Sequence, residues 1–216
     1  MSKSLVVLAF DTSGPHVAAA LLHGETLTAH RSEDMKRGQA ERLMPLLQDL
    51  LSENGLQWSD LDAIGVGTGP GNFTGIRISV AAARGLALAL GKPSIGVTRL
   101  EAAVEGTSAQ FAGLEAPRGG FYLQSFGASP MEPRHWQPDE PLPELTGMAG
   151  APFVGVIPDP LRAVLGNEIA AAMPLTEAIA RIAARRIGTG SQPPRPTYLR
   201  AADAAPSRDS GPVILP

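Results

Sequence analysis

Hydrophobic residues in the first half of the chain form continuous runs and one long helical repeat. Residues 5–10 are an uninterrupted apolar run, which predicts a buried central strand. Residues 17–22 and 25–29 are two more strand-like runs around a glycine turn, and they predict a hairpin. Apolar residues then recur at helical spacing over residues 39–54, where Pro45 predicts a kink or a late start. We therefore expect three strands followed by an amphipathic helix.

A glycine-rich turn separates an apolar strand at residues 63–66 from a long helix of small and apolar residues, 73–90. This glycine loop consists of Gly69, Pro70, Gly71, Asn72, Phe73, Thr74 and Gly75. Asn72 is placed to cap the helix, and one of the glycines beside Pro70 is expected to have a positive φ. A strand, a glycine turn and a helix in this order cradle phosphate groups in many nucleotide-binding proteins. The spacing nevertheless fits neither phosphate fingerprint, because no lysine occurs between Lys36 and Lys92 and Asn72 stands where the dinucleotide pattern needs glycine.

The pattern changes after a strand predicted at residues 94–97. Residues 106–160 are rich in proline and glycine, with strands predicted at 110–114, 120–126 and 152–156. A second amphipathic helix is predicted at 175–187, and the prolines after it predict extended chain that is loose after Arg208. We expect an α/β protein with mixed sheets, an N-terminal lobe at 1–104 and a smaller C-terminal lobe at 105–216 with a proline-rich tail.

Composition restricts the classes of function. The chain has 216 residues, a net charge of −3 and no cysteine. The charge offers no broad attraction for a phosphate backbone, and the lack of cysteine excludes disulfides and thiolate nucleophiles. No stretch comes near the roughly 18 apolar residues of a membrane span. We therefore expect a cytoplasmic protein that does not cross a membrane.

The strongest candidate for chemistry is the turn after the first strand, formed by Asp11, Thr12 and Ser13. Asp11 could position a metal beside a phosphate, which would make the protein a small-molecule kinase or ATPase using Asp11 and the glycine loop. Alternatively, these side chains satisfy the amides of their own turn. No histidine pair has metal-ligand spacing and no serine lies in a nucleophile elbow, so we expect no metal, no cofactor and no catalytic residue.

Two helices carry patterns that suit a partner surface. The first helix has a leucine stripe wider than one buried face needs, and the second carries two arginines seven residues apart beside small residues. The alternative is that both helices only cover their own sheet. The predicted interface residues are Leu43, Leu46, Leu47, Leu50, Arg77, Val80, Ala81 and Arg84.

The run Gly-Pro-Gly-Asn-Phe-Thr-Gly-Ile-Arg at residues 69–77 resembles the Gly-Pro-Gly-Ser-Phe-Thr-Gly-Leu-Arg signature of the bacterial TsaB (YeaZ) family. Residues 10–13, 95–100, 118–122 and 198–200 are similar to further family stretches in the same order. The resemblance is dense from residue 5 to about residue 100. The chain departs from the family at Gly38 and Gln39, where many members carry Glu-His.

The resemblance implies an actin-like, ribonuclease-H-like fold of two lobes, the second reduced. It also implies a non-catalytic scaffold in the complex that makes threonylcarbamoyl-adenosine next to the tRNA anticodon, with Asp11, Thr12 and Ser13 as a vestigial phosphate loop. The implied partners are the catalytic subunit TsaD as a heterodimer and the ATPase TsaE, which docks on the TsaB–TsaD pair. The free protein could form a homodimer, and tRNA would be met only through the complex.

Overall fold

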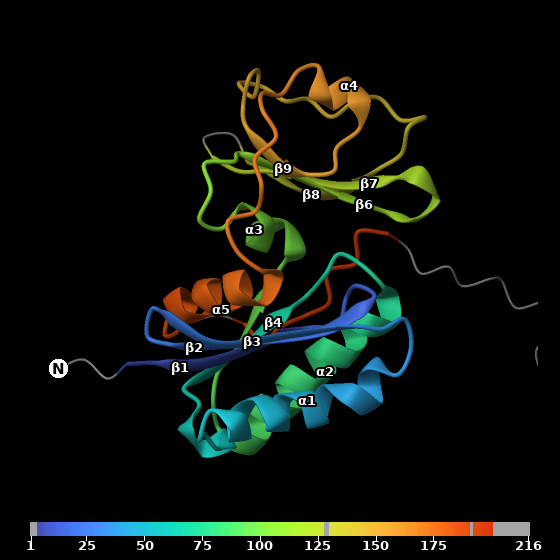
Figure 1. Cartoon of the computed structure of the whole chain (residues 1–216). Coiled ribbons are helices and arrows are strands. Elements are labelled where there is room, and N and C mark those ends of the chain that lie inside the picture. The colour runs from blue at the N-terminus through green and yellow to red at the C-terminus, as the bar shows by residue number, and fades with distance from the viewer. Residues whose placement is uncertain (1–3, 128–129, 191, 201–216) are drawn as a thin grey trace, which may run out of the picture.

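A five-stranded mixed sheet holds the first half of the chain (Figure 1). The computed structural model describes residues 4–127, 130–190 and 192–200. The strands lie in the order β3-β2-β1-β4-β5, with β1, β2 and β3 antiparallel and β4 and β5 added in parallel. This mixed order is that of the ribonuclease-H-like lobe of actin-like proteins, so the predicted fold class is confirmed. The strands are β1 (Val6–Asp11), β2 (His16–His23), β3 (Thr26–Asp34), β4 (Ala63–Gly67) and β5 (Ser94–Val97).

Both faces of this sheet are covered by helices, which explains why its central strand β1 is apolar from Val6 to Phe10. Helices α1 (Gln39–Glu53) and α2 (Phe73–Leu90) pack on one face, and α5 (Leu175–Arg186) packs on the other (Figure 1). Successive side chains of a strand point to opposite faces. Leu8 therefore joins the core under α1 and α2, while its neighbour Val7 joins the core under α5.

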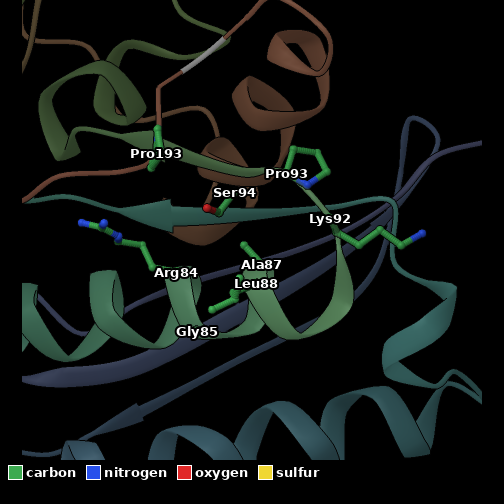
Figure 2. A pocket seen from close by; sticks show the side chains of 8 residues that line it. All are labelled: Arg84, Gly85, Ala87, Leu88, Lys92, Pro93, Ser94 and Pro193. Carbon is green, nitrogen blue, oxygen red and sulfur yellow. The ribbon is translucent and has the colours of Figure 1, made fainter.

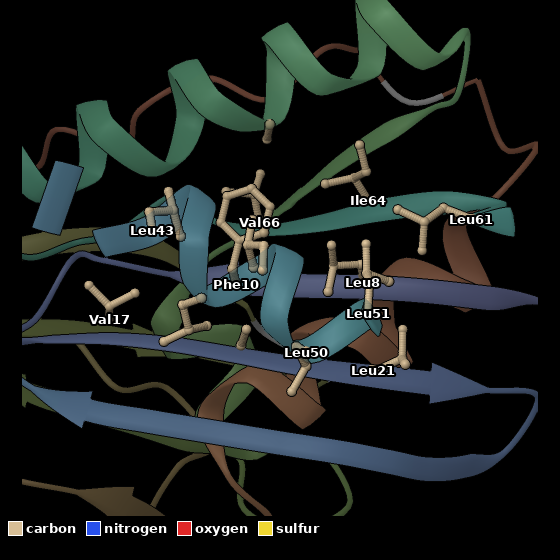
Figure 3. Close-up of a cluster of buried hydrophobic side chains, with 14 of the residues drawn as sticks. Leu8, Phe10, Val17, Leu21, Leu43, Leu50, Leu51, Leu61, Ile64 and Val66 are labelled. Atoms are coloured by element: carbon tan, nitrogen blue, oxygen red, sulfur yellow. The ribbon is translucent and has the colours of Figure 1, made fainter. Parts of the chain in front are cut away.

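The wide leucine stripe of α1 belongs to the protein's own core. Helix α1 packs on the sheet and also against α2, so it buries two adjoining sides (Figure 3). The prediction that these leucines form a partner surface was wrong, because each is at most 2% exposed. They are Leu43, Leu46, Leu47 and Leu50. Pro45 does not delay the helix, which begins at Gln39 and keeps Pro45 on its exposed side.

A second, smaller sheet has the strand order β8-β7-β6-β9. Its strands are β6 (Phe111–Glu115), β7 (Phe121–Ser125), β8 (Met131–Trp136) and β9 (Phe153–Gly155). The sequence predicts β6, β7 and β9 to within two residues but misses β8. That strand lies at the edge of the sheet, and only such a position tolerates a proline like Pro133 within it.

Short helices complete the fold. Helix α3 (Arg99–Val104) connects the two sheets, α4 (Asp159–Arg162) lies over the second sheet, and two 3-10 turns occur at η1 (Trp58–Asp60) and η2 (Pro117–Gly119). The helix predicted at 175–187 is present as α5, but it packs on the first sheet. Residues after the predicted lobe boundary at 104 therefore form the second sheet and also cover one face of the first sheet. The tail predicted to be loose after Arg208 lies outside the described residues.

By length and composition, α2 is apolar enough to cross a membrane. The expectation that no stretch comes near this limit was therefore too strict. In the fold, Ile76, Val80 and Ala83 of α2 are buried on one side of the helix, against the sheet and α1. This packing accounts for only part of the apolar composition, because 28% of the helix is buried.

Replacing Leu47 by alanine tests the core assignment of the leucine stripe. Leu47 is fully buried, so Leu47→Ala should lower the free energy of unfolding by about 2–5 kcal/mol in urea titration. Met44 on the same helix is 40% exposed, and Met44→Ala should change it by no more than about 0.5 kcal/mol. Equal effects of the two substitutions would contradict the assignment.

Candidate functional site

The turn after β1 is closed by the Asp11 side chain. Asp11 is fully buried, and its carboxylate accepts hydrogen bonds from the Ser13 amide at 3.0 Å and from the Ser13 hydroxyl at 2.9 Å. The His16 ring contacts the same carboxylate, with Nε2 lying 2.8 Å from Oδ1. Asp11 thus satisfies the polar groups of its own turn, as an Asx turn does.

These three side chains are not arranged as a nucleophile and its base. A serine nucleophile passes its proton to a histidine that the carboxylate orients from behind. Here the Asp11 carboxylate lies between the other two, and the Ser13 hydroxyl is bonded to it. Ser13 is also only 1% exposed, so a substrate has no access to the hydroxyl in this arrangement.

The glycine loop packs directly on this turn. A methyl group on Gly75 would overlap the carbonyl oxygen of Thr12, and one on Gly71 would overlap that of Ser13. The Thr12 hydroxyl donates to the Gly75 carbonyl at 2.6 Å, and the Asn72 amide donates to the Ser13 carbonyl at 2.7 Å. The space that glycine leaves in a phosphate loop is therefore filled here by protein backbone.

The predicted local features of the loop are present. The Asn72 side chain accepts from the Gly75 amide at 2.9 Å and caps α2. Gly69 has a φ of 92°, so it is the glycine beside Pro70 that needs the left-handed region. Arg99 fixes the outer side of the loop, donating from its amide to the Gly69 carbonyl at 2.8 Å.

Gln39 seals the turn from the side of α1. Its Nε2 donates to the carbonyl oxygens of Gly14 at 2.7 Å and His16 at 3.0 Å. Gln39 is buried, and Gly38 before it has a φ of 83°. An amide donor to two carbonyls does not ligate a metal, and the described residues contain no group of three or more His, Cys, Asp or Glu side chains that could hold a metal ion.

The exposed side of α2 is the second candidate site. We define the α2 face as Arg77, Ala81, Arg84, Gly85 and Leu88, which are exposed and recur three or four residues apart. Val80, predicted to lie on this face, is 4% exposed and packs inward, so that prediction was wrong. Leu88 is 86% exposed and was missed, although its spacing from the two arginines could have revealed it.

The arginines of the α2 face have no acidic partner within the residues that the structure describes. The Arg77 guanidinium lies over the Phe73 ring, 4.8 Å from its centre. Arg84 and Lys92 border an open pocket at the C-terminal end of the helix, with Leu88 between them and Pro193 beside it (Figure 2). The face thus combines apolar surface with cationic groups.

The stretch 118–122 runs from the turn η2 into β7 of the second sheet. Arg118 has a φ of 63°, which is unusual for a residue other than glycine. Tyr122 is buried in a cluster with Leu100 and Ala112, and this burial raises the pKa of its hydroxyl. Burial also lowers the pKa of the neighbouring His135.

The chain is similar to proteins that are named for the synthesis of tRNA threonylcarbamoyladenosine. Residues 30–123 match a family model described as TsaD: tRNA N6-adenosine threonylcarbamoyltransferase. The chain is 39% identical over 100 residues to TsaB from Escherichia coli, which covers 46% of this chain and 43% of that protein. It is 35% identical over 113 residues to TsaB from Bacillus subtilis, covering 52% of this chain and 49% of that one. In these alignments the chain spans about half the length of the curated relatives that it matches.

Solved structures extend the similarity beyond the aligned half. YeaZ from Pseudomonas aeruginosa superposes with a TM-score of 0.70 at 27% identity, over 90% of this chain and 100% of that one. An uncharacterised Pseudomonas aeruginosa protein, described as similar to peptidase YeaZ, gives a TM-score of 0.73 at 27% identity, over 91% and 100%. The two-sheet architecture is therefore shared with these proteins.

Two glycines of α2 provide a matched test of the glycine-loop packing. Gly75→Ala should destabilise the protein by about 1–3 kcal/mol, because the new methyl group meets the Thr12 carbonyl. Gly85 has open space around it, and Gly85→Ala should stabilise the same helix by about 0.5–1 kcal/mol. Thermal melts of both variants measure these changes in stability. A Gly75→Ala variant as stable as Gly85→Ala would disprove the close packing of the glycine loop on the turn after β1.

Proposed function

The chain belongs to the TsaB (YeaZ) family, and we propose that it is a non-catalytic subunit in the synthesis of tRNA threonylcarbamoyladenosine, paired with TsaD. The observation that carries this proposal is the α2 face. It places an 86%-exposed leucine in line with two arginines that have no acidic partner in the described part of the chain. Exposed apolar side chains of this kind supply much of the affinity between two proteins, and charged groups at the edge of the interface determine how the two proteins are oriented.

The arginines of α5 provide an internal contrast. Arg185 is paired with Glu105, the C-cap of α3, and Arg186 is paired with Glu101 in α3, each at 2.6 Å. The hydrogen bond to Glu105 raises the pKa of Arg185. These two arginines of α5 therefore find their carboxylates within the chain. We propose that Arg77 and Arg84, which have no acidic partner among the described residues, pair with carboxylates of another chain.

The Asp11 turn supports the non-catalytic part of the proposal. A kinase or ATPase of this fold would need Asp11 and the glycine loop open to a metal and a phosphate. Asp11 is instead fully buried and bonded to Ser13 and His16, and the glycines accommodate the turn's own carbonyls. The turn therefore serves as structure.

The proposed assembly is supported by similarity to TsaD. The similarity of this chain to a TsaD model and to a TsaD from Erythrobacter litoralis favours pairing between related folds, as a heterodimer with TsaD or as a homodimer when alone. We further propose that the ATPase TsaE docks on that pair and that the protein contacts tRNA only as part of the complex. We also propose that the protein works in the cytoplasm.

Reversing the charge of Arg84 tests the α2 face. Arg84→Glu should weaken association with TsaD of the same organism by at least about tenfold, because it places a carboxylate where the partner is expected to carry one. Unfolding free energy should change by no more than about 0.5 kcal/mol, since Arg84 is exposed. Titration calorimetry and thermal melts measure the two effects.

Arg134 on β8 is the matched control for this reversal. It is 43% exposed, lies on the second sheet, and its ion pair with Glu140 is long, at 3.8 Å. Arg134→Glu should leave the association unchanged. If Arg84→Glu bound TsaD as tightly as this control, the α2 face would not be the interface.

Replacing Asp11 distinguishes the scaffold from the enzyme. Asp11→Ala leaves the Ser13 amide and hydroxyl without their acceptor, so stability should fall by about 1–3 kcal/mol. The isolated parent protein should hydrolyse no ATP with magnesium, and the variant should not differ from it. Magnesium-dependent hydrolysis by the parent that Asp11→Ala removes would instead support the kinase or ATPase.

A further inference from the structure

The chain after α5 crosses back over the carboxyl ends of β4 and β5. We define residues 192–200 as the C-terminal strap. In Figure 1 it is the red segment that lies between the two sheets. The Thr197 amide donates to the Thr68 carbonyl at 2.8 Å, and the Thr197 hydroxyl donates to the Thr68 hydroxyl at 3.1 Å. Pro194 is buried over Gly96, where a methyl group would lie 3.2 Å from its Cβ. The strap is therefore docked at a defined register.

The strap ends against the first turn of α2. The Tyr198 ring stacks on the Phe73 ring, with centres 4.8 Å apart and an angle of 28° between the planes. The Arg77 guanidinium lies over the Phe73 ring, also 4.8 Å from its centre. Tyr198, Phe73 and Arg77 thus form a continuous row from the strap to the α2 face.

The other side of the strap contacts the second sheet. Leu199 packs on the cluster that contains Leu100, Ala112 and Tyr122. Two neighbouring strap residues therefore touch different parts of the molecule, Tyr198 the first turn of α2 and Leu199 the second sheet. This arrangement links the partner surface to the rest of the fold.

We propose that Tyr198 is a positioning residue for the partner surface: it fixes Phe73, and Phe73 holds the guanidinium of Arg77 toward the partner. Phe73 is 39% exposed, so without Tyr198 its ring loses a covering group and samples other rotamers. An arginine without a fixed platform must be ordered at the moment of binding, which lowers affinity. The inference rests on the proposed pairing through the α2 face.

A double-mutant cycle between Tyr198 and Arg77 tests this role with the full-length protein and purified TsaD. Tyr198→Ala should weaken association by about three- to tenfold, the value of one lost aromatic stack. Tyr198→Phe keeps the ring and should bind like the parent protein. In an Arg77→Ala background, Tyr198→Ala should cause no further loss.

The cycle separates positioning from a purely structural role. If Tyr198→Ala lowered only the melting temperature, or if its effect on affinity persisted in the Arg77→Ala background, the positioning role would be overturned. If Arg77→Ala and Arg84→Glu weakened pairing and Tyr198→Ala did not, this inference alone would fail. If Arg77→Ala and Arg84→Glu left pairing intact, the proposed interface itself would fail.

A second measurement needs no partner. Nitrogen-15 relaxation of the arginine Nε groups in the free protein should show a more mobile Arg77 side chain in Tyr198→Ala, with Arg84 unchanged as the internal control. If the Arg77 side chain in Tyr198→Phe is as rigid as in the parent protein, the result supports stacking of the residue 198 ring on Phe73. Equal Arg77 mobility in the parent and in Tyr198→Ala would contradict it, whatever the protein pairs with.

Discussion

The structure depends on the contact between two turns, the one that follows β1 and the glycine loop that follows β4. β1 and β4 are parallel neighbours, so their carboxyl ends open onto the same edge of the sheet. In open α/β sheets that edge is the usual place for a ligand. Here the backbone of Thr12 occupies the gap left by Gly75, and its hydroxyl donates to the Gly75 carbonyl. The interaction that fixes the start of α2 therefore also fills the space between the two turns.

The sequence predicts the parts of this arrangement that depend on local rules. A continuous apolar run identified β1, because a strand covered by helices on both faces has no polar side. Asn72 was recognised as a cap from its position before the helix, and a glycine beside Pro70 was expected to need a positive φ; Gly69 has it. Glycine that makes room for a phosphate cannot be told from glycine that makes room for another turn. Only the position of Thr12 in space decides between them.

The errors at α1 and at Val80 arise from contacts between segments that are distant in the chain. The leucine stripe of α1 is wider than packing on the sheet alone needs, and the additional leucines were predicted to contact a partner protein. The second interface is α2, which the spacing of leucines in α1 cannot identify. Val80 was wrongly placed on the outer face of α2, because a helix of small apolar residues has no clear polar side to show which face is buried. Strand β8 went unrecognised because Pro133 argues against any strand that is not at an edge.

The surface of α2 belongs to the first half of the chain in sequence but depends on the second half in structure. Helix α5 covers the opposite face of the sheet that carries α2, and its arginines hold α3 between the two sheets. The strap then returns to the end of α2, where Tyr198 meets Phe73. A segment comprising the first sheet, α1 and α2 would lack the apolar cover of one sheet face and the ring that stacks on Phe73. For this reason the geometry of the α2 face depends on α5 and on the strap, although both lie far from α2 in the sequence.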